Sequence, residues 1–289
     1  VLGEGSNVLA GDSGYEGIIL LVRIPGITET AHNGAVLLSV GAGVNWDTLV
    51  GDAAARTLWG LENLAGVPGT VGAAPVQNIG AYGAEVKDTL HEVHAIDAST
   101  GKARTFTNTE CSFGYRESRF KKEPNLIITS VSFLLSKDGA PQVGYKDLAN
   151  AFAEGVDLSS PESIGDAVRA IRAHKFPDLT QVGTAGSFFK NPTISEEAYT
   201  SLKKHHSDLP GFPNEHGVKV PLAFVLDHVL NLRGYTEGNV SLFERQPLVL
   251  VTRDGATANE VDAFANNVAE RVLRATGIKI EREVRNFPS

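Results

Sequence analysis

The sequence predicts an α+β fold in two lobes. Its 289 residues are enough for two or three lobes, each with its own core. The first half alternates short apolar segments with glycine-rich turns, whereas the second half contains longer segments with helical spacing. Strand-rich and helix-rich regions that follow one another are typical of the α+β class. We expect the boundary near residue 177, at the tripeptide Phe-Pro-Asp.

The first half is predicted to be rich in strands. Residues 17–24 (GIILLVRI), 35–43 and 126–135 are apolar, β-prone runs bounded by turn-forming residues. A short helix is expected over 46–57. Two alternating segments on either side of the turn at 99–101 predict a hairpin.

The second half has clearer helix boundaries. Ser160 and Pro161 are typical of an N-cap and first helical residue, and this helix should end at about residue 175. Another helix is predicted over 220–233. Thr257 and Glu260 form a capping-box pattern that opens a third helix.

The C-terminal residues alternate in polarity after a helix-closing glycine at 277. This alternation predicts a final strand. One face would carry Ile278, Ile280 and Val284, and the other Glu281, Glu283 and Arg285.

Composition excludes several classes. The formal net charge is −8, which argues against a nucleic-acid or anionic-membrane surface. Cys111 is the only cysteine, so no internal disulfide can form and a reducing compartment is expected. No apolar run approaches the roughly 18 residues of a membrane span, and no signal peptide is visible. The chain also has no methionine, and only Val1 and Leu2 precede a glycine loop, so we expect a missing N-terminal strand–helix portion.

Two glycine-rich loops suggest a bulky ligand. Residues 3–9 (GEGSNVL) lack the third glycine and the following helix of a dinucleotide fingerprint. They fit either an anion nest, in which backbone N–H groups cradle a pyrophosphate, or a plain turn. Residues 65–83 are nearly uncharged, and Gln77, Asn78 and Tyr82 offer neutral hydrogen bonds. This loop suits a cofactor with a pyrophosphate and a flat ring; a purely structural loop is the alternative.

Several single residues have both a functional and a structural interpretation. Arg116 lies among aromatic residues and could clamp a carboxylate, or be a surface charge. Lys175 and Tyr145 could contact a ligand or be ordinary structural residues. Glu283 could be an acid held in a pocket, or an edge charge beside Arg285.

Ser187, within residues 183–192 (GTAGSFFKNP), is not a nucleophile of the usual kind. A nucleophile elbow needs glycine two residues after the serine, where this chain has Phe189. No histidine base backed by an acid is apparent. Residues 205–208 (HHSD) are a weak metal candidate without cysteine partners, and we expect no metal site.

Together these blocks resemble a known family, the UDP-N-acetylenolpyruvoylglucosamine reductases. These flavoenzymes complete UDP-N-acetylmuramate in bacterial peptidoglycan synthesis. The resemblance runs in order over nearly the whole chain, and PVQNIGAYG and GSFFKNP are its most specific blocks. It rests on GEGSNVL, GLENLAGVPGTVGAAPVQNIGAYG, CSFGYRES-F, HKFPD, GSFFKNP, AFVLD and the closing E-x-E-V-R.

The resemblance implies a fold and a domain division. The FAD-binding domain would be of the vanillyl-alcohol-oxidase/PCMH type and cover 1–177, with 1–24 as the remnant of an N-terminal lobe and 25–177 as the second lobe. A smaller α+β substrate-binding domain would cover 178–282. Residues 283–289 would form a strand returning to the FAD lobe.

The resemblance also implies the ligands and their contacts. FAD would be the cofactor and NADPH the co-substrate. The residues expected to hold FAD are Gly3, Gly5, Ser6, Asn7, Pro68, Gly69, Gly72, Ala73, Ala74, Gln77, Asn78, Gly80, Tyr82, Gly83, Ile128 and Arg285. Those expected to hold the UDP-sugar substrate are Tyr145, Arg172, Lys175, Asn191 and Gln246, with Tyr145 on the mobile tyrosine loop found in one form of the family.

The implied reaction has three catalytic residues. Flavin reduced by NADPH would pass a hydride to the enolpyruvyl group. Arg116 and Glu283 would stabilise the resulting enolate-like charge, and Ser187 would donate the proton. A non-catalytic flavin- or nucleotide-binding protein on the same scaffold is the alternative, as is a related flavin oxidase; residues 65–83 have no histidine or cysteine to attach a flavin covalently. The expected protein is a cytoplasmic bacterial monomer that binds small molecules but neither nucleic acid nor membrane.

Overall fold

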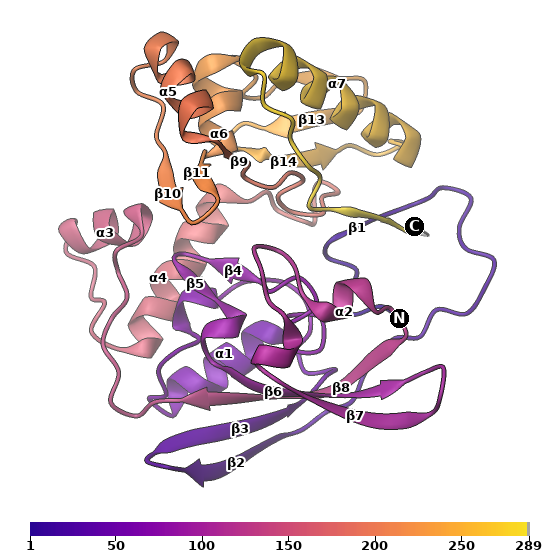
Figure 1. The fold of residues 1–289 in the computed structure, drawn as a ribbon, viewed down its shortest axis with the longest axis vertical. Coiled ribbons are helices and arrows are strands. Elements are labelled where there is room, and N and C mark those ends of the chain that lie inside the picture. The colour runs from indigo at the N-terminus through magenta and orange to yellow at the C-terminus, as the bar shows by residue number, and fades with distance from the viewer. Residues whose placement is uncertain (288–289) are drawn as a thin grey trace. The chain divides into compact units, whose positions relative to one another are not determined.

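The computed structural model describes residues 1–287 and divides the chain into two compact units. Unit 1 comprises 1–5 and 19–172, and unit 2 comprises 6–18 and the described residues from 173 onward. Both units mix helices and strands (Figure 1). The last two residues of the predicted segment 283–289 lie outside the described residues.

Unit 1 is built on a five-stranded antiparallel sheet (Figure 1). The hairpin and the strands predicted over 35–43 and 126–135 are confirmed. In spatial order, the strands are β2 (Ile27–His32), β3 (Ala35–Gly41), β8 (Leu126–Leu135), β6 (Leu90–Asp97) and β7 (Lys102–Thr107).

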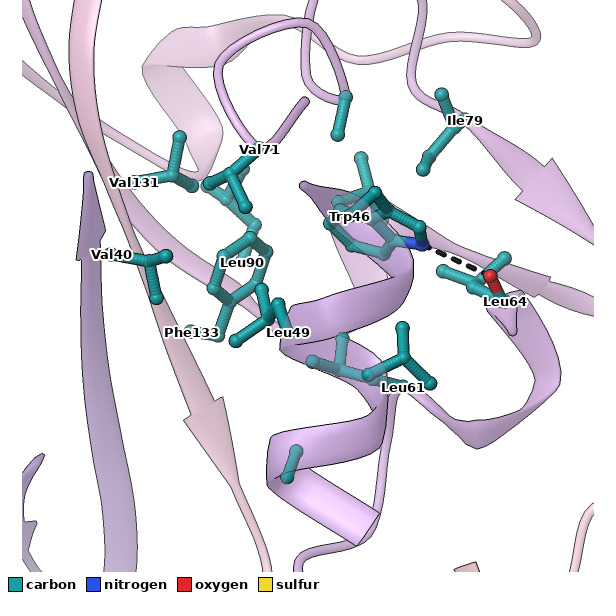
Figure 2. Close-up of a cluster of buried hydrophobic side chains, with 14 of the residues drawn as sticks. Val40, Trp46, Leu49, Leu61, Leu64, Val71, Ile79, Leu90, Val131 and Phe133 are labelled. Atoms are coloured by element: carbon teal, nitrogen blue, oxygen red, sulfur yellow. Dashed lines mark hydrogen bonds between the residues drawn. The ribbon is translucent and has the colours of Figure 1, made fainter. Parts of the chain in front are cut away.

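Helix α1 (Trp46–Ala55) covers the apolar face of this sheet, and confirms the helix predicted over 46–57 (Figure 2). Asn45 caps it by accepting a hydrogen bond from Thr48 N at 3.1 Å. Trp46 is fully buried, meets Phe133 edge to face at 5.8 Å, and donates its indole N–H to Leu64 O at 3.0 Å. The indole therefore joins the sheet, the helix and the segment after it.

Unit 1 also contains several short elements and most of the longer helix α4, whose residues from 173 onward fall in unit 2. Helix α4 begins at Pro161 as predicted, because the Ser160 hydroxyl accepts from Ser163 N at 3.1 Å, and it ends at Lys175. The elements are η1 (Glu62–Leu64), β4 (Gly80–Ala81), β5 (Ala84–Glu85), η2 (Val86–Asp88), η3 (Thr109–Cys111), α2 (Arg119–Lys122), α3 (Lys146–Ala153) and α4 (Pro161–Lys175).

The strand predicted over 17–24 is absent, so that prediction is wrong. Within this run only Leu21 forms a β-bridge, with Leu2, and Ile18 is 91% exposed. β-Propensity expresses packing on a neighbouring strand more than an intrinsic backbone preference. An apolar run without such a neighbour stays irregular.

Unit 2 contains three small sheets and its own core. Its strands are β1 (Val8–Ala10) parallel to β15 (Arg285–Phe287), then β9 (Thr193–Ile194), β10 (Phe212–Asn214), β11 (Gly217–Lys219), β12 (Thr236–Glu237), β13 (Val240–Phe243) and β14 (Gln246–Thr252). Its further helices are α5 (Glu196–His205), α6 (Leu222–Phe224), η4 (Val225–Val229) and α7 (Ala258–Thr276).

Helix α7 has the predicted boundaries. The capping box of Thr257 and Glu260 is formed, and Gly277 closes the helix with a φ of +71°. The Asp12 carboxylate adds a second cap, accepting from Ala258 N at 2.9 Å. Asp12 thereby fixes the segment 6–18 to the helix that supplies much of the unit 2 core.

Two predictions in unit 2 are corrected. The helix expected over 220–233 runs only from 222 to 229, and it continues as a π-helix after Phe224. The expected final strand is regular only over 285–287, although Ile280 and Val284 are buried as the alternation indicated. Burial in this segment comes from packing on the unit 2 core. Arg282 forms only an isolated bridge, and regular strand pairing begins where β1 supplies a partner.

We expect Trp46→Phe to lower the stability of unit 1 by about 1–3 kcal/mol, because the Leu64 carbonyl would lose its buried donor. Both tryptophans lie in unit 1, so Trp59 fluorescence during urea unfolding would follow that unit. Trp59→Phe is the matched control, since Trp59 is only partly buried. A Trp46→Phe protein as stable as the control would contradict this role.

Candidate active site

The glycine-rich loop over 68–83 is held in a conformation that needs glycine. Gly69 has a φ of +119°, and Asn78 and Tyr82 have φ values of +45° and +47°. A Cβ on Gly72 would lie 2.6 Å from the Ala42 Cβ. The loop backbone therefore packs directly on the end of β3, and a side chain at Gly72 would displace it.

Glu4 joins the first glycine segment to this loop, a role that the sequence analysis missed. Its carboxylate accepts from Gly69 N and from the Asn45 side chain, each at 3.1 Å. Gly3 lies against Thr70, since a Cβ there would come within 2.9 Å of the hydroxyl oxygen. The signal in the sequence was an acidic residue between two glycines of an otherwise neutral loop.

The residues predicted to contact the flavin differ in burial and in the hydrogen bonds that they already make within the protein. Asn78 is fully buried, donates to Glu85 and Gly114 O, and accepts from Lys87 N, so its side chain serves the protein. Ile128 is buried in the core through β8. Within the loop, Ala74 is buried, Pro68 and Gly83 are exposed, and Ala73, Gln77 and Gly80 are half-buried.

Arg116 contacts this loop near its C-terminal end, at Gly80. Its backbone has a φ of +57°, and its guanidinium donates to Gly80 O at 2.8 Å. The Ser118 hydroxyl donates to Val76 O at 2.6 Å, which fixes the segment carrying Arg116 against the loop. Arg116 also stacks over the Tyr115 ring at 5.3 Å. A guanidinium held in this way is suited to a planar carboxylate.

Tyr82, Arg172 and Tyr145 lie together in unit 1. The Tyr82 and Tyr145 rings meet edge to face at 5.3 Å. Burial raises the pKa of Tyr82 to about 12, although the charge of Arg172 and a hydrogen bond to it act in the opposite direction. Burial also lowers the pKa of Arg172. The structure thus brings together two of the predicted substrate residues and one predicted cofactor residue.

In unit 2, Ser187 lies in a short extended segment that forms isolated bridges to β14 and to the segment around Arg282. Ser187 pairs with Val249, and Phe189 pairs with Arg282. Phe188 and Phe189 are buried, and Phe188 N donates to Leu248 O at 2.8 Å. The two phenylalanines anchor the segment in the core and leave Ser187 half-buried.

Glu283 is adjacent to this segment. Its N–H donates to Phe188 O at 2.8 Å, and its carbonyl accepts from the Asn7 side chain at 3.3 Å. Arg285 N donates back to Asn7 O at 3.3 Å, where β15 begins to pair with β1. Ser187, Glu283 and the half-buried Ser6–Asn7 dipeptide are therefore connected through hydrogen bonds that begin at Phe188. The contact between the Phe188 carbonyl and Glu283 joins segments far apart in the sequence, so no local pattern indicates it.

The remaining predicted substrate residues lie at the ends of elements. Asn191 accepts from Leu222 N at 2.9 Å and so caps α6. Gln246 opens β14, and its buried Oε1 has no hydrogen-bond partner among residues 1–287. Lys175 is the half-buried last residue of α4. An acceptor buried without a donor is costly and is expected where a ligand supplies the donor.

Residues 1–287 contain neither a metal-binding cluster nor a membrane-spanning helix. No group of three or more His, Cys, Asp or Glu side chains could hold a metal ion there. Within the same residues, no helix is both long and apolar enough to cross a membrane.

The chemistry of the glycine loop fits a flavin dinucleotide. Residues 68–83 carry no charged side chain. Positive φ values and close packing at Gly3 and Gly72 leave the backbone free of side chains where a large ligand must approach. A neutral polar loop beside Arg116 can accommodate a flat ring and still offer one cation.

Comparison with known proteins agrees with this chemistry. Residues 1–107 match the FAD binding domain family, and 178–287 match the family described as UDP-N-acetylenolpyruvoylglucosamine reductase, C-terminal domain. The chain is thus an FAD-dependent oxidoreductase.

Full-length relatives identify the family. The UDP-N-acetylenolpyruvoylglucosamine reductase of Chromobacterium violaceum is 42% identical over 98% of this chain and 84% of its own length. That of Neisseria meningitidis serogroup A is 40% identical over 100% of this chain and 84% of its own length. The chain belongs to the UDP-N-acetylenolpyruvoylglucosamine reductase family.

The fold agrees with that of a solved family member. The crystal structure of the reductase from Thermus caldophilus has a TM-score of 0.63 at 24% identity, and the alignment covers 99% of this chain and 84% of that one. The predicted α+β class with an FAD-binding domain is therefore confirmed.

We expect Gly72→Ala to reduce the FAD that copurifies with the protein, because the added methyl would push the loop off Ala42. The flavin absorbance per protein measures this. Gly51→Ala is the control, since a Cβ there would meet no atom closer than the Arg169 side chain at 3.7 Å, apart from its chain neighbours and the nearby backbone of α1. Full flavin content in Gly72→Ala would show that the close approach is not needed for FAD binding.

Proposed function

We propose that the chain catalyses the NADPH-dependent reduction of UDP-N-acetylglucosamine enolpyruvate to UDP-N-acetylmuramate in bacterial peptidoglycan synthesis. The observation that carries this proposal is Ser187 held beside Glu283 by the Phe188 backbone, in a chain of the reductase family. When bound and reduced by NADPH, FAD would supply the hydride for the vinyl carbon farther from the substrate carboxylate.

The residues proposed to hold FAD form two groups. Gly3, Gly5 and the loop 68–83 belong to unit 1, together with Ile128. Ser6, Asn7 and Arg285 belong to unit 2. Backbone groups of Asn78, and not its side chain, would make the contact, because the amide is fully engaged within the protein.

Arg116 and Glu283 are proposed to stabilise negative charge on the substrate. Hydride addition leaves charge on the carbon next to the carboxylate, so the carboxylate becomes enolate-like. Arg116 would pair with it as a fixed cation, and the protonated carboxyl group of Glu283 would donate a hydrogen bond. Donors fixed before the reaction are usually the largest catalytic contribution. The hydrogen bonds from Arg116 to Gly80 O and from Glu283 N to Phe188 O support such fixed positions.

Ser187 is proposed as the proton donor to the carbanionic carbon. A serine hydroxyl is a weak acid, but a carbanion is a strong base, so a well-placed hydroxyl suffices. A positioned general acid contributes roughly 10²–10⁴-fold in rate. The half-buried position of Ser187 and the buried phenylalanines after it support a fixed hydroxyl.

The substrate nucleotide would be held by polar groups from several elements. Lys175, Asn191 and Tyr145 are proposed to contact the diphosphate, and Arg172 and Gln246 to add further contacts. The unpartnered Oε1 of Gln246 supports a ligand donor at that position.

The wider biological setting is part of the same proposal. We propose an FAD-binding domain over 1–177, a substrate-binding domain over 178–282 and a C-terminal strand from 283. We place the enzyme in the cytoplasm as a monomer that binds neither nucleic acid nor membrane. The net charge of −8 and the single cysteine support this setting. A non-catalytic flavin-binding protein is disfavoured, because Arg116, Ser187 and Glu283 are all present.

For Ser187→Ala we expect NADPH to reduce the bound flavin normally, whereas reoxidation by the enolpyruvyl substrate falls roughly 10²–10⁴-fold. Stopped-flow flavin absorbance measures both steps. Ser195→Ala is the control, because this serine caps α5 in the same unit and should affect stability alone. Unchanged reoxidation in Ser187→Ala would rule out the proton-donor role.

A further inference from the structure

Asp47 and Arg169 form an ion pair, and neither residue is among those proposed to bind FAD or substrate or to act in catalysis. Arg169 Nε lies 3.1 and 3.0 Å from the two carboxylate oxygens of Asp47, and a terminal nitrogen lies 3.0 Å from Oδ1. Asp47 belongs to the first turn of α1 and Arg169 to α4, so the pair joins the two helices. Burial alone would raise the pKa of the Asp47 carboxyl, but hydrogen bonds from Arg169 and Gly66 outweigh it and lower the pKa.

The pair also holds the turn at Gly66. Gly66 N donates to Asp47 Oδ1 at 2.7 Å, and Gly66 O accepts from Arg172 Nε at 2.9 Å. Gly66 has a φ of +68°, and a Cβ there would lie 3.1 Å from the Arg172 Cδ. The N–H and the carbonyl of Gly66 thus make one hydrogen bond each, to Asp47 and to Arg172. A shift of Asp47 would therefore move the Gly66 carbonyl that accepts from Arg172.

The connection continues to the predicted substrate residues. Arg172 hydrogen-bonds the Tyr82 hydroxyl, and the Tyr82 ring meets the Tyr145 ring edge to face. Asn63 fixes this end by donating to Tyr82 O and to Gln142 O, each at 2.8 Å. Gln142 precedes the segment that carries Tyr145. The Gly66 turn thus links a structural ion pair to the side chains proposed to bind the nucleotide.

We propose that Asp47 and Arg169 are positioning residues for the enolpyruvyl nucleotide, acting through Gly66 on the guanidinium of Arg172. Arg172 has a single planar fork of donors, and its direction depends on the carbonyl that fixes Nε. The pair therefore sets substrate affinity without touching the substrate. This inference rests on the proposed role of Arg172 as a contact to the nucleotide.

The test uses four single variants of the FAD-loaded protein. Asp47→Asn and Arg169→Gln break the pair. Asp52→Asn and Arg56→Gln are controls, since they break a local aspartate–arginine ion pair at the C-terminal end of α1, away from the Asp47 and Arg172 contacts to Gly66. Single-turnover reoxidation of the reduced protein, followed over a range of enolpyruvyl nucleotide concentrations, gives an apparent Kd and a maximum rate.

We expect the apparent Kd to rise about tenfold in the two test variants, the size of a lost charge-assisted hydrogen bond. The maximum rate and the flavin content should stay near those of the parent protein, and the controls should bind the nucleotide normally. An unchanged Kd in Asp47→Asn and Arg169→Gln, or an equal rise in the controls, would overturn the inference. If Asp47→Asn does not fold, Arg169→Gln decides alone, because it leaves the carboxylate available to Gly66 N.

Arg172→Gln separates this inference from the proposed function. If Arg172→Gln leaves the Kd unchanged, the contact role of Arg172 is wrong, and the positioning role fails with it. If Arg172→Gln weakens binding and the pair variants do not, only the positioning role fails. The double variant Asp47→Asn/Arg172→Gln should bind no more weakly than Arg172→Gln; a further multiplicative loss would mean that the pair acts by another route.

Discussion

The carbonyl oxygen of Phe188 accepts hydrogen bonds from two consecutive amides, Glu283 N at 2.8 Å and Val284 N at 3.4 Å. The candidate catalytic residues of unit 2 depend on this one acceptor. Ser187 immediately precedes Phe188, whose ring is buried in the unit 2 core, so the serine cannot move without the core. Because the Glu283 carbonyl also accepts a hydrogen bond from the Asn7 side chain, the same acceptor connects the backbone at Ser187, the backbone at Glu283 and the segment that enters β1.

In unit 1 the corresponding constraint acts on the glycine loop, whose backbone is held by hydrogen bonds although it has little regular secondary structure. Backbone donors at the start of the loop are satisfied by Glu4 and by the end of β3, and Trp46 fixes the neighbouring segment at Leu64. Arg116 can therefore offer its charge from a fixed position at Gly80 O. The Gly66 turn is hydrogen-bonded to Asp47 of α1 and to Arg172 of α4, and this is the contact through which the Asp47–Arg169 pair is proposed to affect binding. Packed networks transmit small shifts because they have little room to absorb them.

Elements with local signals could be predicted from the sequence. The capping box at Thr257 and the apolar strand 126–135 were correct, because caps and periodicity act over a few residues. The run 17–24 is also apolar, but within residues 1–287 it forms only the isolated bridge between Leu21 and Leu2. The helix predicted over 220–233 is shorter and becomes π-helical after Phe224, which no residue type in this segment indicates. Family blocks predicted Arg116, Ser187 and Glu283 as catalytic residues, whereas the Glu4 carboxylate and the Phe188 carbonyl make contacts between distant segments, which one sequence does not reveal.

The most direct test of this account is a double-variant cycle on Ser187 and Glu283, measured as the rate of flavin reoxidation by the enolpyruvyl substrate. If the Phe188 backbone makes the two residues act on one charge, they form a single unit, and such units are strongly non-additive. Ser187→Ala/Glu283→Gln should then reoxidise about as slowly as the slower single variant. A double variant whose loss is the full product of the two single losses would contradict the account.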